Sequence, residues 1–280
     1  MRSVEEHIRQ ANLIFNYVYE DNFSPLYFNT NEKLKTIFDF IPVFGKTVLT
    51  PLASSDQLFS SYYCGASRVD AFDINELTFN YFYLRLWSLI RRGYLDVSHC
   101  DNTSIAQLLP SSFRTFSEAR ATMFWETLLE CHPSIMTSNL FYTEGNDYYQ
   151  HSVPFAGDLL KLQKIMKDKE LNFYSRDFYT PIDIDNKYKV ILLSNILEYH
   201  GDDVNKLRIA RDNLSRLLAD DGVIVATNLM YGEGSPSFTE RQIMETEFIF
   251  KNGPWQYNSN HKQELPVYYT YQKKVLPKKG

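Results

Sequence analysis

Glycine is scarce in this sequence, and several common patterns are absent. Only 11 of the 280 residues are glycine, and no GxGxxG run occurs. This absence argues against a nicotinamide-dependent oxidoreductase, whose first turn is glycine-rich so that the backbone can approach a pyrophosphate. The three cysteines, Cys64, Cys100 and Cys131, form no CxxC pair and leave one over. The pattern therefore indicates neither a disulfide framework nor a zinc site, and we expect no metal.

The sequence also lacks a basic excess and long apolar runs. The formal net charge is −5, which makes nucleic acid an unexpected main partner. No run of about 18 apolar residues occurs, so we expect no membrane span. The first turns carry Glu5, Glu6 and Arg9 where a secretory signal would be apolar, and we expect a cytoplasmic protein.

The most informative stretch is 46–75, KTVLTPLASSDQLFSSYYCGASRVDAFDIN. An apolar run at 46–52 predicts a strand, 57–65 predicts a helix, and the alternation at 69–73 predicts a second strand. Together they form a βαβ unit of the kind that binds nucleotides. An acid at the tip of the second strand, here Asp73, is placed to accept hydrogen bonds from both hydroxyls of a ribose.

The remaining pattern predicts an α/β fold with a mostly parallel sheet and helices on both faces. Residues 1–45 form an expected cap with a helix at 3–20, and 46–280 form the main domain. Within it, 94–170 is expected to be a helical insertion, with helices at 104–109, 115–131 and 155–168. The other expected helices are 76–92 and 203–219, and the strands are 170–174, 189–193, 223–227, 244–250 and 267–273, the last two as a terminal hairpin. An Asp221–Gly222 turn should precede strand 223–227.

Ligands in such a sheet lie beyond the carboxyl ends of the strands. The first turn offers the small residues Ala53, Ser54 and Ser55 to a ligand; the alternative is a plain strand-to-helix turn with a serine as N-cap. Asp73 could cap the following helix, but Asn75 can perform that task and leave Asp73 for a ligand.

Two later loops carry polar groups at the same edge. An acid followed by an aromatic residue, Asp177 and Phe178, can bind an exocyclic amine and pack on an adenine, or can be a plain surface loop. The segment SNILEYH, 194–200, directly follows a buried strand, where the reacting part of a ligand would lie. Glu198 or His200 could act there as a base, although His200 could simply begin a surface helix.

The motif VLTPLASSDQLFSSYYCGASRVDAFDIN resembles the first two motifs of the class I S-adenosylmethionine-dependent methyltransferase superfamily. More narrowly, it is similar to a branch related to the S-adenosylmethionine:diacylglycerol 3-amino-3-carboxypropyl transferases. SPLYFNTNE upstream and LLSNILEYH downstream also resemble that branch. The resemblance covers roughly 25–92 and 171–230, and it implies a Rossmann-like class I methyltransferase sheet.

The resemblance implies S-adenosylmethionine as cofactor and a transferase activity. Asp73 would hold the ribose, Ile74 would pack on adenine, and the other cofactor-binding residues would be Leu52, Ala53, Ser54, Ser55, Asp56, Gln57, Asn75, Asp177, Phe178, Ser194 and Asn195. The candidate catalytic residues are Glu198, Tyr199 and His200. Ser55 stands where the branch usually has glycine, and the acidic-x-Gly-x-Gly pattern is missing.

The acceptor and the transferred group stay open at this stage. A methyl group or a 3-amino-3-carboxypropyl group could be transferred, since the two outcomes differ only in which carbon of the sulfonium is attacked. The Asn/Asp-Pro-Pro-aromatic motif of nucleic-acid amino-methylating enzymes is absent, so a small or amphipathic acceptor is expected. Tyr142, Tyr148, Tyr149 and His151 are expected to cover it. A non-catalytic nucleotide-binding domain remains the alternative, and the sequence does not predict an oligomeric state.

Overall fold

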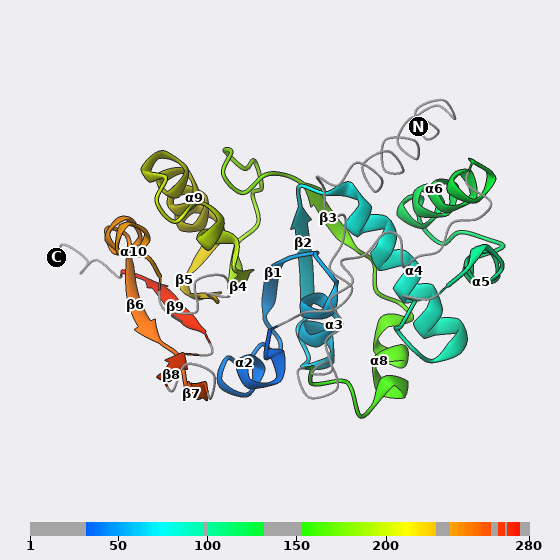
Figure 1. Ribbon diagram of the computed structural model, residues 1–280, viewed down its shortest axis with the longest axis horizontal. Coiled ribbons are helices and arrows are strands. Elements are labelled where there is room, and N and C mark those ends of the chain that lie inside the picture. The colour runs from blue at the N-terminus through cyan, green and yellow to red at the C-terminus, as the bar shows by residue number, and fades with distance from the viewer. Residues whose placement is uncertain are drawn as a thin grey trace.

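A seven-stranded sheet forms the centre of the molecule (Figure 1). The computed structural model describes residues 32–97, 100–131, 153–227, 236–258, 263–266 and 268–274. The strand order is β3-β2-β1-β4-β5-β9-β6, with β9 antiparallel to both of its neighbours. The strands are β1 Thr47–Pro51, β2 Arg68–Asp73, β3 Asn172–Ser175, β4 Tyr188–Ser194, β5 Leu218–Ala226, β6 Phe248–Asn252 and β9 Tyr269–Lys273; β7 Trp255–Asn258 and β8 Gln263–Pro266 form a separate antiparallel pair. The predicted fold class is therefore confirmed.

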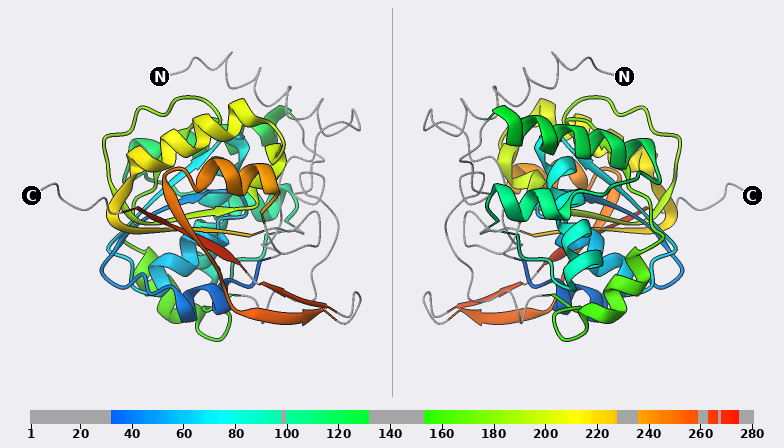
Figure 2. Two further views of the ribbon diagram at one scale, coloured as in Figure 1. Left: turned by 90° about the vertical axis from the view of Figure 1, so that its left-hand side faces the viewer. Right: turned by 90° about the vertical axis from the view of Figure 1, so that its right-hand side faces the viewer.

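Helices cover both faces of the sheet. Figure 2 shows α9 and α10 on one side, and α2, α3 and α8 on the other. The helices are α2 Leu34–Phe40, α3 Asp56–Tyr63, α4 Glu76–Arg92, α5 Asn102–Leu108, α6 Phe116–Cys131, α8 Leu159–Met166, α9 Val204–Leu217 and α10 Phe238–Met244, with a 3-10 helix η2 at Ile196–His200. Helix α2 packs into the core through Leu34, Ile37 and Phe38, which are buried.

Successive side chains of the strands pack into two separate hydrophobic cores, one on each face of the sheet. Val190 and Leu192 of β4 join the core shared with α2 to α8, whereas Ile191 and Leu193 join the core shared with α9 and α10. Because successive strand residues point to opposite faces, a strand that is apolar throughout belongs in the middle of a sheet covered on both sides. This confirms the prediction made from the apolar run at 189–193.

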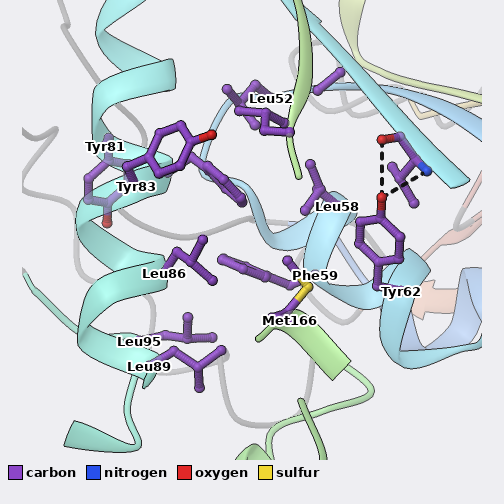
Figure 3. Close-up of a cluster of buried hydrophobic side chains, with 14 of the residues drawn as sticks. Leu52, Leu58, Phe59, Tyr62, Tyr81, Tyr83, Leu86, Leu89, Leu95 and Met166 are labelled. Atoms are coloured by element: carbon purple, nitrogen blue, oxygen red, sulfur yellow. Dashed lines mark hydrogen bonds between the residues drawn. The ribbon is translucent and has the colours of Figure 1, made fainter. Parts of the chain in front are cut away.

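The larger core is built mainly where α3, α4 and α8 meet. Figure 3 shows Phe59 of α3 between Leu86 of α4 and Met166 of α8, all of them buried. Tyr62 of the same helix turns its hydroxyl toward β2, where the backbone N–H of Val69 donates to it at 3.2 Å. Helix α3 is thereby fixed against the sheet, and its first turn lies at the carboxyl end of β1.

Most predicted elements are found within a few residues of their predicted bounds, including the last strand, whereas β5 begins earlier than predicted and the strand 244–250 differs in kind. Helix α4 spans 76–92 as predicted and ends at Gly93, whose φ is 76°. The predicted strand 244–250 is wrong in its first part, because Met244 ends helix α10 and β6 begins at Phe248. Ser237 caps α10, and this cap together with the burial of Ile243 and Met244 at helical spacing favours the helix.

Two further expectations differ from the structure or lie outside it. Asp221 and Gly222 were predicted to make a turn, but they lie inside β5, where the pairing with β4 shifts register between Tyr188 and Val190. The turn-forming residues therefore produce an irregularity in the strand. The predicted helix at 3–20 and the residues Tyr142, Tyr148, Tyr149 and His151 lie outside the described residues.

Candidate functional site

The turn after β1 adopts a backbone that normally requires glycine. Ala53 has φ 39° and Ser55 has φ 72°, both in the left-handed region. Ser55 precedes helix α3 and makes no side-chain capping bond, and its hydroxyl is buried without a hydrogen-bond partner among the described residues. The sequence indicated small residues here, and the structure adds that they form a sharp turn without glycine.

A buried ion pair supports this turn from beneath. Arg85 of α4 donates from Nη2 to Asp56 Oδ1 at 2.9 Å, and both side chains are within 1% of full burial. Arg85 also donates to the carbonyl oxygen of Ser54, and the Ser54 hydroxyl donates to Asp56 Oδ2 at 2.9 Å. The structure thus places Asp56, a sequence candidate for cofactor binding, inside the protein as a support of the turn.

Asp73 joins the ends of β1 and β2. Its Oδ2 accepts from the backbone N–H of Ala53 at 2.9 Å, and its Oδ1 accepts from that of Asn75 at 2.9 Å. Burial raises the pKa of Asp73 above its ordinary value, although the hydrogen bonds oppose this effect. The Thr78 side chain and the backbone of Ile74 also hydrogen-bond to this carboxylate, and the residue as a whole is intermediate in exposure.

Asn75 and Ile74, which follow Asp73 in sequence, have different roles. Asn75 caps α4, because its side chain accepts from the backbone N–H of Leu77 at 3.0 Å. This confirms that Asn75, and not Asp73, performs the capping. Ile74 is 71% exposed, which is unusual for an isoleucine and leaves an apolar surface directly beside Asp73.

The loop after β3 lies against Asp73. The backbone N–H of Arg176 donates to the carbonyl oxygen of Asp73 at 3.1 Å. Asp177 accepts from the backbone N–H of Tyr179 at 2.9 Å and so shapes its own loop. The ring of Phe178 is buried and packs on Phe72 at 5.0 Å between centroids. Phe178 therefore belongs to the core directly behind the candidate site.

A second strained turn follows β4. Ser194 has φ 55°, and its carbonyl oxygen accepts from the backbone N–H of Thr227 at 2.9 Å. Asn195 stands at the N-cap position of η2 but makes no side-chain capping bond. The ends of β4 and β5 are thus joined at the same edge of the sheet as the turn after β1.

The three candidate catalytic residues differ in exposure. Glu198 is 5% exposed, whereas Tyr199 is 49% exposed. The ring of His200 stands edge-on to Tyr179 at 4.6 Å, and its Nε2 lies 3.1 Å from the Nζ of Lys206. Tyr179 also donates from its hydroxyl to the carbonyl oxygen of Ile196. The loop after β3 and the loop after β4 are therefore in direct contact.

Four residues important to this edge were not among the sequence candidates. They are Glu32, Thr50, Thr227 and Arg85. Glu32 is buried, and its two carboxylate oxygens accept from Thr227 and from the sequence candidate Gln57. Thr50 donates to Gln57 Oε1 at 2.5 Å. Glu32 ends the motif SPLYFNTNE that resembled the aminocarboxypropyl transferase branch, so a signal for it existed, whereas Arg85 lies on an amphipathic helix and gave none.

Among the described residues, no group of three or more His, Cys, Asp or Glu side chains is arranged to hold a metal ion. In the same part of the chain, no helix is long and apolar enough to cross a membrane.

Comparison with protein-family models and with curated proteins gives no match. Among solved structures, the chain is similar to the N-methyltransferase NodS from Bradyrhizobium japonicum in complex with S-adenosyl-L-homocysteine, with 8% identity, 95% of this chain and 98% of that chain covered, and a TM-score of 0.46. A TehB-like SAM-dependent methyltransferase from Corynebacterium glutamicum matches with 10% identity over 96% of this chain and 100% of that chain, with a TM-score of 0.42. A SAM-dependent O-methyltransferase from Thermotoga maritima matches with 10% identity over 96% of this chain and 73% of that chain, with a TM-score of 0.35.

Proposed function

We propose that this chain is an S-adenosylmethionine-dependent transferase. One observation carries the proposal: among the described residues, the non-glycine residues with a left-handed backbone, Ala53, Ser55 and Ser194, lie at the carboxyl ends of β1 and β4. These strands are neighbours in the sheet, and the order of the chain reverses between them. Ligands of open α/β sheets bind at such a switch point, and strained backbone concentrates at functional sites.

The residues around the switch point suit the parts of such a ligand. Asp73 can accept hydrogen bonds from two vicinal hydroxyls, and the exposed Ile74 offers an apolar surface to a base. The turn at 53–55 offers backbone groups at the start of α3 to a carboxylate. S-adenosylmethionine supplies a sulfonium whose attached carbons are electrophilic, so the protein's own task is mainly to align the acceptor.

Two transfers remain within this proposal. The superfamily resemblance favours transfer of a methyl group to a small or amphipathic acceptor. The narrower resemblance of FDIN and SNILEY favours transfer of a 3-amino-3-carboxypropyl group. Glu198, Tyr199 and His200 follow β4 directly, and we propose that one of them accepts a proton from the acceptor. Of these, Tyr199 and His200 are the more accessible.

Titration calorimetry with S-adenosylhomocysteine tests the cofactor assignment. Asp73→Asn should weaken binding at least tenfold, because charge-assisted hydrogen bonds to the ribose are lost. Asp220→Asn is the control, since Asp220 is 96% exposed near the start of β5, away from the carboxyl ends of the strands. A folded wild-type protein that does not bind would overturn the proposal and favour a domain without transferase activity.

A double-label experiment separates the two transfers. S-adenosylmethionine carrying tritium in its methyl group and carbon-14 in its carboxyl group is incubated with the protein and candidate acceptors. Tritium alone in the product identifies methyl transfer. Carbon-14 alone identifies aminocarboxypropyl transfer. The two labels lie on different groups of the sulfonium, so a single attack transfers only one of them.

A further inference from the structure

Tyr179 contacts both ends of the short helix that carries the candidate catalytic residues. Its hydroxyl donates to the carbonyl oxygen of Ile196, the first residue of η2. Its ring stands edge-on to the ring of His200, the last residue of η2, with 4.6 Å between the centroids. Tyr179 itself is buried and lies in the loop after β3, 176–182. One side chain of that loop therefore fixes η2 at its start and at its end.

Helix η2 depends on other elements for its position. It has only five residues, and 3-10 helices of this length are weakly stabilised by their own hydrogen bonds. Its N-cap residue, Asn195, makes no side-chain capping bond, and Ser194 before it has a left-handed backbone. Such backbone strain persists only where the surrounding structure holds it. Tyr179 provides a contact of this kind at each end of the helix.

The hydroxyl of Tyr179 keeps its proton and so acts as a donor. Burial raises the pKa of Tyr179 above its ordinary value, and the nearby Glu240 and Asp177 raise it in the same direction. A phenol that stays protonated donates one hydrogen bond. The bond to the carbonyl oxygen of Ile196 is therefore retained across the physiological pH range.

The loop that carries Tyr179 is also bonded to Asp73. The backbone N–H of Arg176 donates to the carbonyl oxygen of Asp73 at 3.1 Å. The ring of Phe178 packs on Phe72, the residue before Asp73, and Tyr179 follows Phe178 directly in sequence. Because protein interiors are close-packed, a small displacement at Asp73 is passed along such contacts.

Helix α9 holds the backbone on either side of Tyr179. Asn213 of α9 is buried, and its side-chain amide donates to the carbonyl oxygens of Phe178 at 2.9 Å and of Thr180 at 2.8 Å. Its amide oxygen accepts from the backbone N–H of Ile182 at 3.1 Å. The loop is therefore held in one defined structure, and its contacts with Asp73 and with η2 belong to a single connected unit.

We propose that Tyr179 is a positioning residue that couples the nucleoside end of the site, at Asp73, to η2; this assignment rests on the proposed function. A nucleoside bound at Asp73 lies against the loop after β3, and Tyr179 passes the resulting displacement to both ends of η2. The candidate catalytic residues Glu198, Tyr199 and His200 thereby reach their working positions only with the nucleoside in place. The cofactor therefore binds before the acceptor.

The ring resonances of His200 in nuclear magnetic resonance spectra test the coupling on the wild-type protein. The variant His200→Gln identifies them among those of the six histidines. 5′-Methylthioadenosine, which carries the nucleoside but not the amino-acid end, is added to saturation as measured by calorimetry, and we expect the His200 resonances to shift. If only S-adenosylhomocysteine binds, it takes the place of this ligand. Saturation without a shift would overturn the coupling, whereas failure of both ligands to bind would overturn the proposed function.

The variant Tyr179→Leu tests the same coupling from the protein side. It removes both the hydroxyl and the ring, so saturating ligand should no longer shift the His200 resonances. Tyr174→Leu is the control, because Tyr174 lies in β3 and its hydroxyl interacts with Asp70 and Asn186. This control should keep the shift of the wild type.

A tyrosine that only supports the fold gives a different result. Tyr179→Leu would then lower the free energy of unfolding but leave the ligand-induced shift unchanged, and that outcome would overturn the proposal. If Tyr179→Leu does not fold, Tyr179→Phe decides, because it loses only the bond to Ile196. It should show a smaller shift than the wild type, and an equal shift would contradict the proposal.

Discussion

The two faces of the sheet bury carboxylates in opposite ways. On the face of α3 and α4, Asp56 is paired with the guanidinium of Arg85. On the face of α9 and α10, Glu240 is equally buried, but the hydroxyls of Tyr269 and Tyr271 both donate to its Oε1 at 3.0 Å. The first carboxylate thus has a cationic partner, whereas the second has neutral donors and is subject to the effect of burial.

The pKa of Glu240 is moved toward the physiological pH range. The pKa of Glu240 is raised from 4.5 to about 7, mainly by burial; the hydrogen bonds from Tyr269 and Tyr271 oppose this rise, and the nearby Glu198 adds to it. Ser237, which caps α10, also donates to the carbonyl oxygen of Gly201 at the end of η2, at 2.7 Å. Helix α10 is thereby attached to the candidate catalytic loop, and Glu240 interacts electrostatically with Glu198 of that loop.

The largest effect should come from breaking the ion pair. Arg85→Met leaves Asp56 buried without its guanidinium, and we expect a loss of about 3–5 kcal/mol in the free energy of unfolding. Urea denaturation measures it. Arg91→Met, the same change at an exposed position of the same helix, should cost less than about 0.5 kcal/mol. If Arg85→Met loses as little free energy of unfolding as Arg91→Met, the ion pair between Arg85 and Asp56 contributes little to stability.

The second effect concerns Glu240 and pH. Its raised pKa means that the folded state binds the proton more tightly, so this contribution to stability is full below pH 4.5 and falls as the pH rises to about 7. The loss is on the order of 3 kcal/mol, at about 1.4 kcal/mol for each tenfold change in proton affinity. Glu240→Gln, which resembles the protonated form, should flatten the curve of unfolding free energy against pH.

Glu247→Gln controls for removal of a carboxylate, because Glu247 is exposed in the turn after the same helix. This variant should show the same slope of unfolding free energy against pH as the wild type between pH 4.5 and 7. The assignment to Glu240 is contradicted if both variants keep that slope.

The smallest effect concerns the carboxylate of Asp70, which has both a cationic partner and a neutral hydroxyl donor. Asp70 accepts a two-pronged bond from Arg68 at 2.7 Å and a bond from the hydroxyl of Tyr188 at 2.7 Å. Tyr188→Phe removes one neutral donor while Arg68 remains, so we expect a loss of about 1–2 kcal/mol. Tyr174→Phe, whose hydroxyl lies 3.4 Å from the same carboxylate, should cost less. Urea denaturation of both variants ranks them, and the reverse order would show that distance is a poor guide here.

Local signals explain why much of the fold was predictable. Helix α4 has a capping Asn75 and a closing Gly93, and β4 is an apolar run, so each carries its own evidence within a few residues. Helix α10 was missed because its short sequence combines a capping Ser237 with apolar residues that also suit a strand. In such short segments periodicity does not separate helix from strand.

The site was predictable only in its local part. Asn75 could be assigned to capping because it acts on the backbone two residues away, whereas the bond of Asp73 to Ala53 spans 20 positions. Glu32 and Thr227 are 195 positions apart, and nothing in a single sequence pairs them. The strained turn was also beyond prediction, since left-handed alanine and serine are uncommon and become acceptable only when groups such as Arg85 fix the surrounding structure.

The placement of β9 has a consequence for synthesis of the chain. It lies between β5 and β6, yet it follows every other described strand in sequence. As the chain leaves the ribosome, β5 therefore keeps an unpaired edge and β6 has no neighbour until residues 269–273 emerge. During that interval the growing sheet exposes backbone groups to which another chain could pair. A protein built in this way depends on rapid completion of its last strand to avoid association while it is being made.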